Sequence, residues 1–541
     1  MLSAEIRPHP VIKPKSSRFF FIKSFKVSNR DSLSSIEVES MPQLKVLGGG
    51  REVGRSCLQL DINGHHFLLD CGINPAAEGR ASLPDLSQTS IEHLDGVFVS
   101  HAHLDHTGAI PELLRHGFDG KVYMTLPTLA LLNLLWQDEL SIMEREWTKD
   151  QRLWSSKEMH KILMKLAVPT TYHEVFKLNS VRVNFHNAGH ILGSTMTEII
   201  NNNYRILYSG DLGTSSNHLR YWRTEDLANP DVLICEGTYG GKNRKSRAET
   251  EKELLSKIRA ALEGGGKVLI PTFSVGKTHE ILKIIKDSWS SLPNVDVYLE
   301  GMAIETLRVY EQFLIYMDDK VRRAFIFNNI NPFRWDALRI FKGLTERKQL
   351  HRKEGPCIIM APSGMLRGGW SVWHMMRMAS SEKNLIALCG HMAAGTTGAG
   401  LLDGTRDFLL RDMISKVEVG IRVSCNVAHF DLSSHAMHNE LCNYISKLKP
   451  ELLVLVHGEE SSLNALAESV QQYAGRVVIP AVGEKIDLMQ PAVSQESPHN
   501  VEIPLAQSTS LILNKEASMK VRHMGREKYM RAADLRSLVR R

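Results

Sequence analysis

Residues 100–108, Ser-His-Ala-His-Leu-Asp-His-Thr-Gly, constrain this chain more than any other segment. They place four potential metal ligands within six positions, directly after the apolar run at residues 96–99. Neighbouring side chains of a helix point apart, so the four cannot share one helical face. On a tight loop between a strand and a helix they can diverge toward two ions, and their chemistry suits Zn²⁺. The four are His101, His103, Asp105 and His106.

Four more candidate ligands each stand where an apolar run ends. They are Asp70 after residues 67–69, His190 after residues 181–185, Asp211 after residues 206–208 and His457 after residues 452–456. Any one of them could be a helix cap or an ordinary polar residue. As a set they repeat one arrangement, an acid or an imidazole beside glycine at the end of a strand. Active sites lie in such places, so we predict that these residues belong to one metal site.

The histidine and cysteine content favours nitrogen and oxygen ligands. The chain of 541 residues has 23 His but only seven Cys, which are scattered and form no Cys-x-x-Cys pair. This disfavours a disulfide framework or a cysteine zinc ribbon and fits a reducing compartment. The formal charge of +6 permits a polyanionic substrate without requiring one. No apolar run approaches the roughly 20 residues that span a bilayer, so no membrane association is expected.

The apolar pattern predicts two kinds of α/β organisation. Up to about residue 240, meandering strands interleave with helices at residues 110–116, 129–143 and 157–166, which favours helices on the outer faces of two sheets. From about residue 242 strands and helices alternate, as in a parallel, doubly wound insert. After residue 425 a helix and a strand follow, and the last 27 residues are basic and weakly helical.

The predicted ligands resemble the motifs of the metallo-β-lactamase superfamily, carried here by Asp70, residues 101–106, His190 and Asp211. Three more segments resemble the β-CASP subgroup, whose members cleave nucleic acids. They are Cys-Glu-Gly-Thr-Tyr-Gly at residues 235–240, Leu-Ser-Ser-His at 432–435 and Val-His-Gly-Glu at 456–459. The resemblance covers about residues 44–489 and includes residues 49–56 and 271–277. It points to the cleavage and polyadenylation specificity factor nucleases, their archaeal and bacterial homologues and the Integrator endonuclease.

The resemblance implies an α/β fold, an αββα metallo-β-lactamase sandwich with an inserted doubly wound β-CASP domain. The expected domains are residues 41–240 for the first part of the sandwich, 241–424 for the β-CASP domain, 425–490 for the return segment and 491–541 for a basic C-terminal tail. Residues 1–40 are expected to be a disordered basic extension. Two alternatives for residues 1–40 are a transit peptide and a translation start at Met41.

Three histidines compete for the role of the second β-CASP histidine. His429, His435 and His438 all precede His457, and His429 follows Val-Ala, which superficially resembles the usual Ser-Ala. We choose His435 because it follows Leu-Ser-Ser and stands 22 residues before His457, the spacing that the resemblance implies. The family usually has an acid two residues later, where this chain has Met437. This departure puts an auxiliary polar contact in doubt.

The resemblance also implies a role for each residue. One Zn²⁺ would bind His101, His103 and His190, a second would bind Asp105, His106 and His457, Asp211 would bridge them, and Asp70 would orient ligands from behind. Together the two Zn²⁺ ions would activate water for attack on phosphorus. His435, oriented by Glu236, would protonate the departing 3′ oxygen. Catalysis would therefore depend on His435, Glu236 and Asp105.

The expected activity is zinc-dependent hydrolysis of single-stranded RNA to 5′-phosphate and 3′-hydroxyl ends, in RNA 3′-end processing or decay. We expect an endonuclease, with 5′-to-3′ exonuclease activity as an addition. One alternative is a metallo-hydrolase of another phosphodiester or thioester, against which Glu236, His435 and the insert argue. Another is an inactive scaffold, against which the intact ligands argue. A homodimer or an RNA-processing complex is expected, in the cytoplasm, or in the nucleus of a eukaryote.

Overall fold

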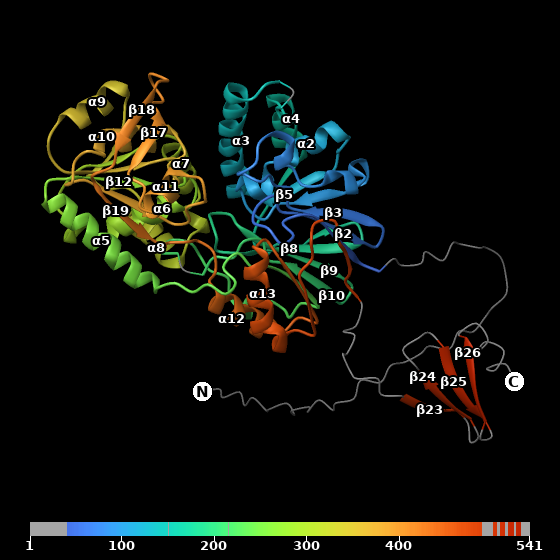
Figure 1. Ribbon diagram of the computed structural model, residues 1–541. Coiled ribbons are helices and arrows are strands. Elements are labelled where there is room, and N and C mark those ends of the chain that lie inside the picture. Colours follow the sequence, from blue (N-terminus) through green and yellow to red (C-terminus); the bar gives the residue numbers. More distant parts are fainter. Residues whose placement is uncertain are drawn as a thin grey trace, which may run out of the picture. The chain divides into compact units, whose positions relative to one another are not determined.

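The computed structural model describes residues 41–149, 151–214 and 216–489 in full. It also gives the backbone of four strands nearer the C-terminus, β23 (Val501–Leu505), β24 (Thr509–Leu513), β25 (Ser518–His523) and β26 (Arg526–Arg531). The predicted extension at residues 1–40 lies outside the described residues. Figure 1 shows the arrangement of the elements.

Two seven-stranded sheets form the centre of the sandwich. In spatial order the first contains β22 (Lys485–Asp487), β1 (Gln43–Gly48), β2 (Cys57–Ile62), β3 (His65–Leu69), β4 (Gly96–Phe98), β5 (Lys121–Thr125) and β6 (Ala167–Thr170). The second contains β21 (Arg476–Val478), β20 (Leu452–Val456), β11 (Val232–Glu236), β10 (Tyr204–Tyr208), β9 (Thr195–Asn201), β8 (Val181–Asn187) and β7 (Phe176–Leu178). Buried side chains of both sheets, such as Phe67, Phe98 and Phe185, form one hydrophobic core. Burial of such aromatic side chains holds the two sheets face to face.

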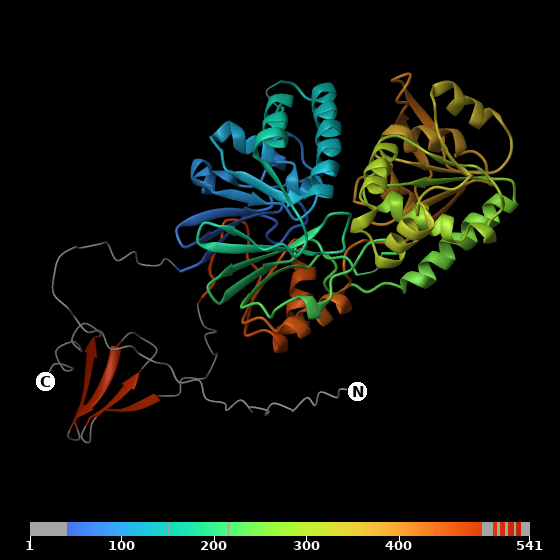
Figure 2. The same ribbon diagram turned by 180° about the vertical axis from the view of Figure 1, so that it is seen from behind.

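Helices cover the outer face of each sheet (Figures 1 and 2). On the first sheet, α3 (Leu126–Glu146) packs Leu131 and Trp136 into a cluster with Val97 and Val122. The short helices α2 (Ile110–Leu113) and α4 (Ser156–Lys161) lie on the same side. On the second sheet, α12 (His438–Leu448) and α13 (Glu460–Val470) form a separate buried cluster with the strands. The predicted αββα layering is confirmed.

A third sheet between β11 and α12 in the chain is fully parallel. Its order is β14 (Leu338–Ile340), β13 (Val297–Leu299), β15 (Cys357–Ala361), β12 (Lys267–Pro271), β16 (Leu385–Cys389) and β19 (Asn426–Phe430). Successive residues of β12 join different clusters: Val268 and Ile270 pack with α5 (Arg247–Glu263) and α6 (Lys277–Asp287), whereas Leu269 packs with α10 (Gly369–Met378). This alternation places helices on both faces. The predicted doubly wound insert is confirmed.

The insert returns the chain to the strand that it left. β20 pairs in parallel with β11, from Val232 opposite Leu452 to Glu236 opposite Val456. The end of β11 and the end of β20 therefore lie side by side, although more than 200 residues separate them in the chain. This return matters for the site, because Glu236 ends β11 and His457 follows β20 directly.

The C-terminal region corrects one expectation. We expected residues 515–541 to be weakly helical, but within this range residues 518–523 and 526–531 are the strands β25 and β26, which join β24 and β23 in one antiparallel sheet. The other residues of this range lie outside those that the structure describes. The sequence of β25 alternates polar residues with Met519 and Val521, a period of two that favours a strand over a helix. Among the residues that the structure describes, no helix is long and apolar enough to span a bilayer. All seven cysteines are free thiols.

Candidate active site

The predicted ligands converge at one edge of the sandwich because neighbouring parallel strands end there. Asp70 follows β3 directly, and His101 and His103 lie on the loop between β4 and α1 (Leu104–Thr107). Strands β3 and β4 are parallel, as are β10, β11 and β20. Parallel strands present their carboxyl ends at the same edge of a sheet. The loops that follow them therefore bring distant segments together.

Asp211 lies at the centre of this cluster, with its two carboxylate oxygens facing different histidines. Its Oδ2 lies 3.6 Å from Nε2 of both His101 and His190. Its Oδ1 lies 3.3 Å from His106 Nε2 and 3.3 Å from His457 Nδ1. The carboxylate therefore separates two groups of imidazoles and is placed to serve a metal ion on either side.

The other predicted ligands complete the two groups. On the first side, His103 Nδ1 lies 3.1 Å from His101 Nε2 and 3.3 Å from His190 Nε2. On the second side, Asp105 Oδ2 lies 3.5 Å from His457 Nε2. Ligand atoms lie within 4.8 Å of one another in the group His101, His103 and His190, and likewise in the group Asp105, His106 and His457. Each group has the donor chemistry and the number of protein ligands of a zinc site.

Several buried atoms in the cluster lack a hydrogen-bond partner among the described residues. They are His106 Nε2, Asp211 Oδ1 and His457 Nε2. A buried polar atom without a partner is costly, and native proteins rarely leave one unsatisfied. A bound cation would satisfy such atoms, so the residues present fit a metal centre.

Burial and charge keep most of these groups in the form that binds metal. Burial lowers the pKa of His101, His103 and His190, so these imidazoles stay neutral and can donate a lone pair. Burial alone would raise the pKa of Asp211, but the charges of His106 and other histidines outweigh it and lower that pKa well below its usual value. The central carboxylate is therefore ionised.

Asp70 lies behind the ligands, and hydrogen bonds occupy both of its carboxylate oxygens. Its carboxylate accepts hydrogen bonds from Ser100 N–H, Ser100 Oγ and Tyr208 OH, each at 2.7 Å, and lies 2.8 Å from His106 Nδ1. The contact to Nδ1 directs His106 Nε2 toward Asp211 and Asp105. Asp70 has a φ of 59°, a strained left-handed conformation that only the surrounding contacts can hold.

Glu236 and His435 form a second acid–imidazole pair beside the cluster. Both carboxylate oxygens of Glu236 lie near His435 Nδ1, at 3.2 and 3.1 Å, and Leu212 N–H donates to Glu236 Oε1 at 2.6 Å. Burial disfavours protonation of His435, but Glu236 and Asp211 outweigh it and raise the pKa of His435 to about 9. The two competing histidines lie elsewhere, because His429 Nε2 contacts Gly390 O and His438 Nδ1 accepts from Gly241 N–H.

Sequence reasoning did not identify the residues that support this arrangement. Ser100 and Tyr208 bind Asp70, and Thr238 lies against both Glu236 and the backbone oxygen of His457. Ser100 and Thr238 lie inside predicted motifs. Their closeness in sequence to the predicted ligands could therefore have indicated a supporting role. Tyr208 ends β10, and nothing in its local pattern distinguishes it from an ordinary core aromatic residue.

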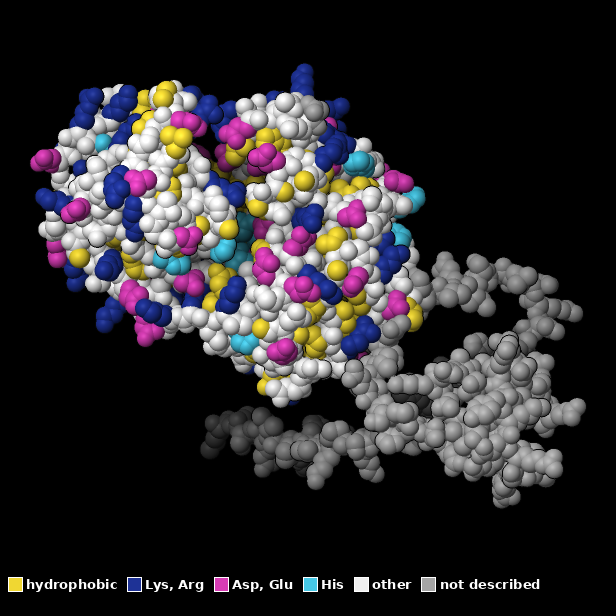
Figure 3. Space-filling model, in the orientation of Figure 1, with side chains coloured by type: hydrophobic (Ala, Val, Ile, Leu, Met, Phe, Trp, Pro, Cys, Tyr) yellow, Lys and Arg dark blue, Asp and Glu magenta, His cyan; other side chains and the backbone are white. Residues whose placement is uncertain are grey.

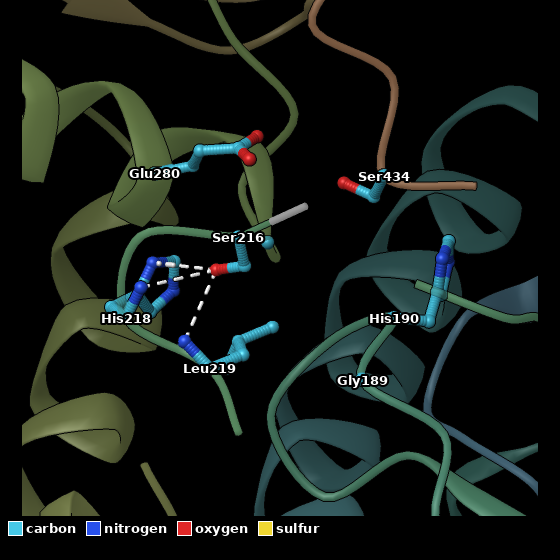
Figure 4. A pocket seen from close by; sticks show the side chains of 8 residues that line it. Gly189, His190, Ser216, His218, Leu219, Glu280 and Ser434 are labelled. Carbon is cyan, nitrogen blue, oxygen red and sulfur yellow. Dashed lines mark hydrogen bonds between the residues drawn. The ribbon is translucent and has the colours of Figure 1, made fainter. Parts of the chain in front are cut away.

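The cluster opens toward the insert. A small pocket beside His190 is lined by residues of the sandwich, of the insert and of the return segment (Figure 4); they are Gly189, His190, Ser216, His218, Leu219, Gly276, Glu280 and Ser434. Lys277 Nζ lies 3.4 Å from Ser434 Oγ and forms a buried ion pair with Glu280. Figure 3 shows histidine side chains where the surface is hollowed between the sandwich and the insert. The side chains of Asp105 and His435 are 22% and 21% exposed, so solvent reaches the cluster through these two residues.

Comparison with known proteins agrees with this geometry. Family models match the metallo-β-lactamase superfamily at residues 50–272, the Beta-Casp domain at residues 278–401 and a Zn-dependent metallo-hydrolase RNA specificity domain at residues 420–480. The transcription termination factor FttA of Methanocaldococcus jannaschii is 35% identical over 441 residues, which cover 80% of this chain and 69% of that protein. The chain belongs to the β-CASP family of metallo-β-lactamase-fold hydrolases.

Other members of the β-CASP family are similar over the same region. The cleavage and polyadenylation specificity factor 73 of Drosophila melanogaster is 31% identical, covering 80% of this chain and 62% of that protein. Integrator complex subunit 11 of Danio rerio is 30% identical, covering 82% of this chain and 74% of that protein. A crystal structure of an Enterococcus faecalis protein of unknown function has a TM-score of 0.53 at 15% identity, covering 83% of this chain and all of that one, which shows the fold alone.

Membership confirms the predicted resemblance and the predicted fold class. The chain is a metallo-hydrolase with a β-CASP insert, and the family implies a divalent metal at the His/Asp cluster.

Proposed function

We propose that this β-CASP protein is a ribonuclease that uses two Zn²⁺ ions to hydrolyse single-stranded RNA within the cleft between the sandwich and the insert. The observation that carries the proposal is the convergence of two ligand groups on Asp211, with the Glu236–His435 pair beside them. The RNA specificity domain matched at residues 420–480 contains both His435 and His457, which supports RNA as the substrate.

The ligand assignments stay those predicted from the motifs. His101, His103 and His190 would hold one ion, Asp105, His106 and His457 the other, and Asp211 both. When bound, the two ions supply a nucleophile at neutral pH by lowering the pKa of water and offset charge on the phosphoryl oxygens. Asp70 orients His106 through Nδ1. The hydroxyl of Thr238 donates to the backbone oxygen of His457 and so fixes the loop that carries this histidine.

His435 is placed to deliver the proton that the reaction requires. Hydrolysis breaks the bond between phosphorus and the 3′ oxygen, and that oxygen must gain a proton as it leaves. His435 is held by Glu236 through Nδ1, so its Nε2 is the atom that can reach the leaving oxygen. The charges of Glu236 and Asp211 outweigh burial and raise the pKa of this imidazole, which favours its protonated form at neutral pH. The products are then a 5′-phosphate and a 3′-hydroxyl.

The relatives suggest where this reaction is used. Their names place them in transcription termination, in cleavage and polyadenylation and in the Integrator complex. We therefore propose a role in RNA 3′-end processing within a larger assembly, with the cytoplasm as the expected location. We also retain the domain boundaries predicted from the sequence, with the β-CASP domain at residues 241–424.

End-labelled RNA tests the proposal directly. The zinc-loaded full chain is incubated with single-stranded RNA labelled at the 5′ or the 3′ end, and the product ends are identified by their susceptibility to phosphatase and to a 5′-phosphate-dependent exonuclease. We expect internal cuts with 5′-phosphate and 3′-hydroxyl ends; mononucleotides released from the 5′ end would add exonuclease activity. Cyclic 2′,3′-phosphate ends would contradict the mechanism, and intact RNA at full zinc occupancy would favour the scaffold alternative.

A further inference from the structure

A two-stranded hairpin in the insert stands apart from all three large sheets. Its strands are β17 (Asp407–Arg411) and β18 (Glu418–Arg422), which pair only with each other, from Asp407 opposite Arg422 to Arg411 opposite Glu418. No other strand of the described chain pairs with either of them. Figure 1 shows the hairpin at the rim of the insert, beyond the parallel sheet. Both outer edges of the hairpin are therefore open.

One face of the hairpin is packed and the other is exposed. Phe408, Leu410 and Ile421 lie against the hydrophobic cluster beside α10. Leu409 points the other way, between exposed Asp407 and Arg411, and its side chain is 67% exposed. Opposite Leu409 stands Gly420, where an added Cβ would meet nothing within 4 Å. Leu409 thus lies exposed at the middle of β17, between two charged side chains, and no described strand pairs with the outer edge of β17.

The hydrogen bonds at the two ends of the hairpin define which backbone groups of β17 are unpaired. Val423 N–H donates to Arg406 O at 2.7 Å, and Asp412 N–H donates to Val417 O at 2.9 Å. Antiparallel pairs alternate between hydrogen-bonded and non-hydrogen-bonded positions. The bonds to β18 therefore fall at residues 408 and 410, and the N–H and C=O groups of residues 407, 409 and 411 point outward. Such an edge is a template for another strand.

The sequence of β17 is complementary to itself when it is read in the opposite direction. In Asp-Phe-Leu-Leu-Arg, a twofold axis at Leu409 sets Asp407 opposite Arg411 of a second copy and sets the two Leu409 side chains opposite each other. We propose that β17 pairs antiparallel with β17 of a second copy of this chain, so that the two hairpins form one four-stranded sheet across a twofold axis. Such an isologous contact closes on itself and yields a dimer.

β17 is better suited to this contact than β18. The outward residues of β18 are Glu418, Gly420 and Arg422, and self-pairing would place two glycines at the axis, where they offer no side-chain contact. At the axis of β17, leucine packs against leucine and adds a favourable cross-strand pair. Asp407 already pairs with Arg422 at 2.9 Å, and a carboxylate can accept a second donor. The contact is small and far below a standard interface, so the dimer is weak and concentration-dependent.

Sedimentation or light scattering of the full chain at increasing concentration tests the proposal. We expect the wild type to dimerise reversibly at concentrations up to about 100 µM, as for a weak interface. Leu409→Lys brings two like charges together at the axis. It should raise the midpoint concentration, at which half of the chains are dimeric, at least about tenfold. Val417→Lys makes the same change at a residue of this hairpin that is 58% exposed and outside β17, and should leave the midpoint unchanged.

A charge exchange tests the register. Asp407→Arg alone and Arg411→Asp alone each place like charges opposite each other in a self-pair, so each should be more monomeric than the wild type. Mixed in equal amounts, the two variants restore both opposite-charge pairs and should form a heterodimer, which general damage to the hairpin cannot produce. A wild type that stays monomeric, a Leu409→Lys chain that dimerises like the wild type, or a mixture that stays monomeric would each overturn the proposal. A dimer that persists in every variant would do so as well.

Discussion

Replacing Glu236 with Gln removes the charge that faces His435 while keeping the size of the side chain. Glu236 is 1% exposed, and its carboxylate oxygens lie 3.1 and 3.2 Å from His435 Nδ1. A glutamine oxygen can still accept the hydrogen bond of Leu212 N–H, so the loop should keep its position. The change therefore isolates the electrostatic effect of Glu236 on the proposed acid.

The magnitude follows from the pKa of His435. Burial lowers this pKa, but Glu236 and Asp211 outweigh burial and raise it to about 9. An opposite charge at this range moves a pKa by about 1 to 3 pH units, so Glu236→Gln should bring it to roughly 6 to 8. An acid catalyst works only while it is protonated, so activity falls as the pH rises through its pKa. A pKa of about 7 would reduce the protonated fraction at pH 8 about tenfold.

The assay is the pH dependence of single-turnover RNA cleavage, with zinc content measured for each protein. Glu236→Gln should lose its activity at least one pH unit below the pH at which the wild type loses its activity, with unchanged zinc content. Glu459→Gln, which changes an exposed carboxylate close to His457, is the matched control and should follow the wild type. If the activity of the wild type and of Glu236→Gln falls at the same alkaline pH, Glu236 does not raise the pKa of the acid catalyst.

Three further predictions follow from the same structure. His435→Ala should retain zinc but lose about 10²- to 10⁴-fold in cleavage rate, while His429→Ala and His438→Ala should be mild; an essential His429 would show that the histidine was misassigned. In the metal-free chain, the raised pKa of His435 stabilises the fold below about pH 6.5, and this stabilisation is lost as the pH rises through about 9. The Tm of the wild type should therefore exceed that of His435→Ala at low pH, and the difference should disappear across that range. A Tm difference that stays constant with pH would contradict the assignment. The sequence from residue 515 onward carries nine Lys or Arg against three acidic residues. Deleting residues 491–541, which removes β23–β26 together, should weaken RNA binding and flatten its salt dependence, and equal salt slopes would exclude a contribution from the tail.

The sequence predicted that the candidate ligands lie together, because each of them follows a local rule. Each of Asp70, His190, Asp211 and His457 stands where an apolar run ends, and the ends of parallel strands meet at one edge of a sheet. The same apolar patterns predicted strands such as β20, at residues 452–456, and helices such as α3, at residues 129–143. These elements bury side chains at regular spacing, so their periods are visible in the sequence.

Contacts between distant segments could not be predicted in this way. Tyr208 binds Asp70 across 138 positions, and His435 meets Glu236 across 199. The motif spacing suggested His435 over its neighbours, but only the fold shows that His429 and His438 contact backbone groups elsewhere. The left-handed backbone of Asp70 and His457 is likewise set by surrounding contacts and leaves no local signal.

The proposed two-zinc site is best tested by measuring zinc content and single-turnover cleavage of single-stranded RNA together, for the wild type, His103→Ala and Asp105→Ala. Each substitution removes a ligand from a different group around Asp211. We expect two zinc ions per chain in the wild type, a lower zinc content in each variant and no cleavage by either, with the fold retained. Full zinc occupancy with retained cleavage in either variant would contradict the assignment of the site.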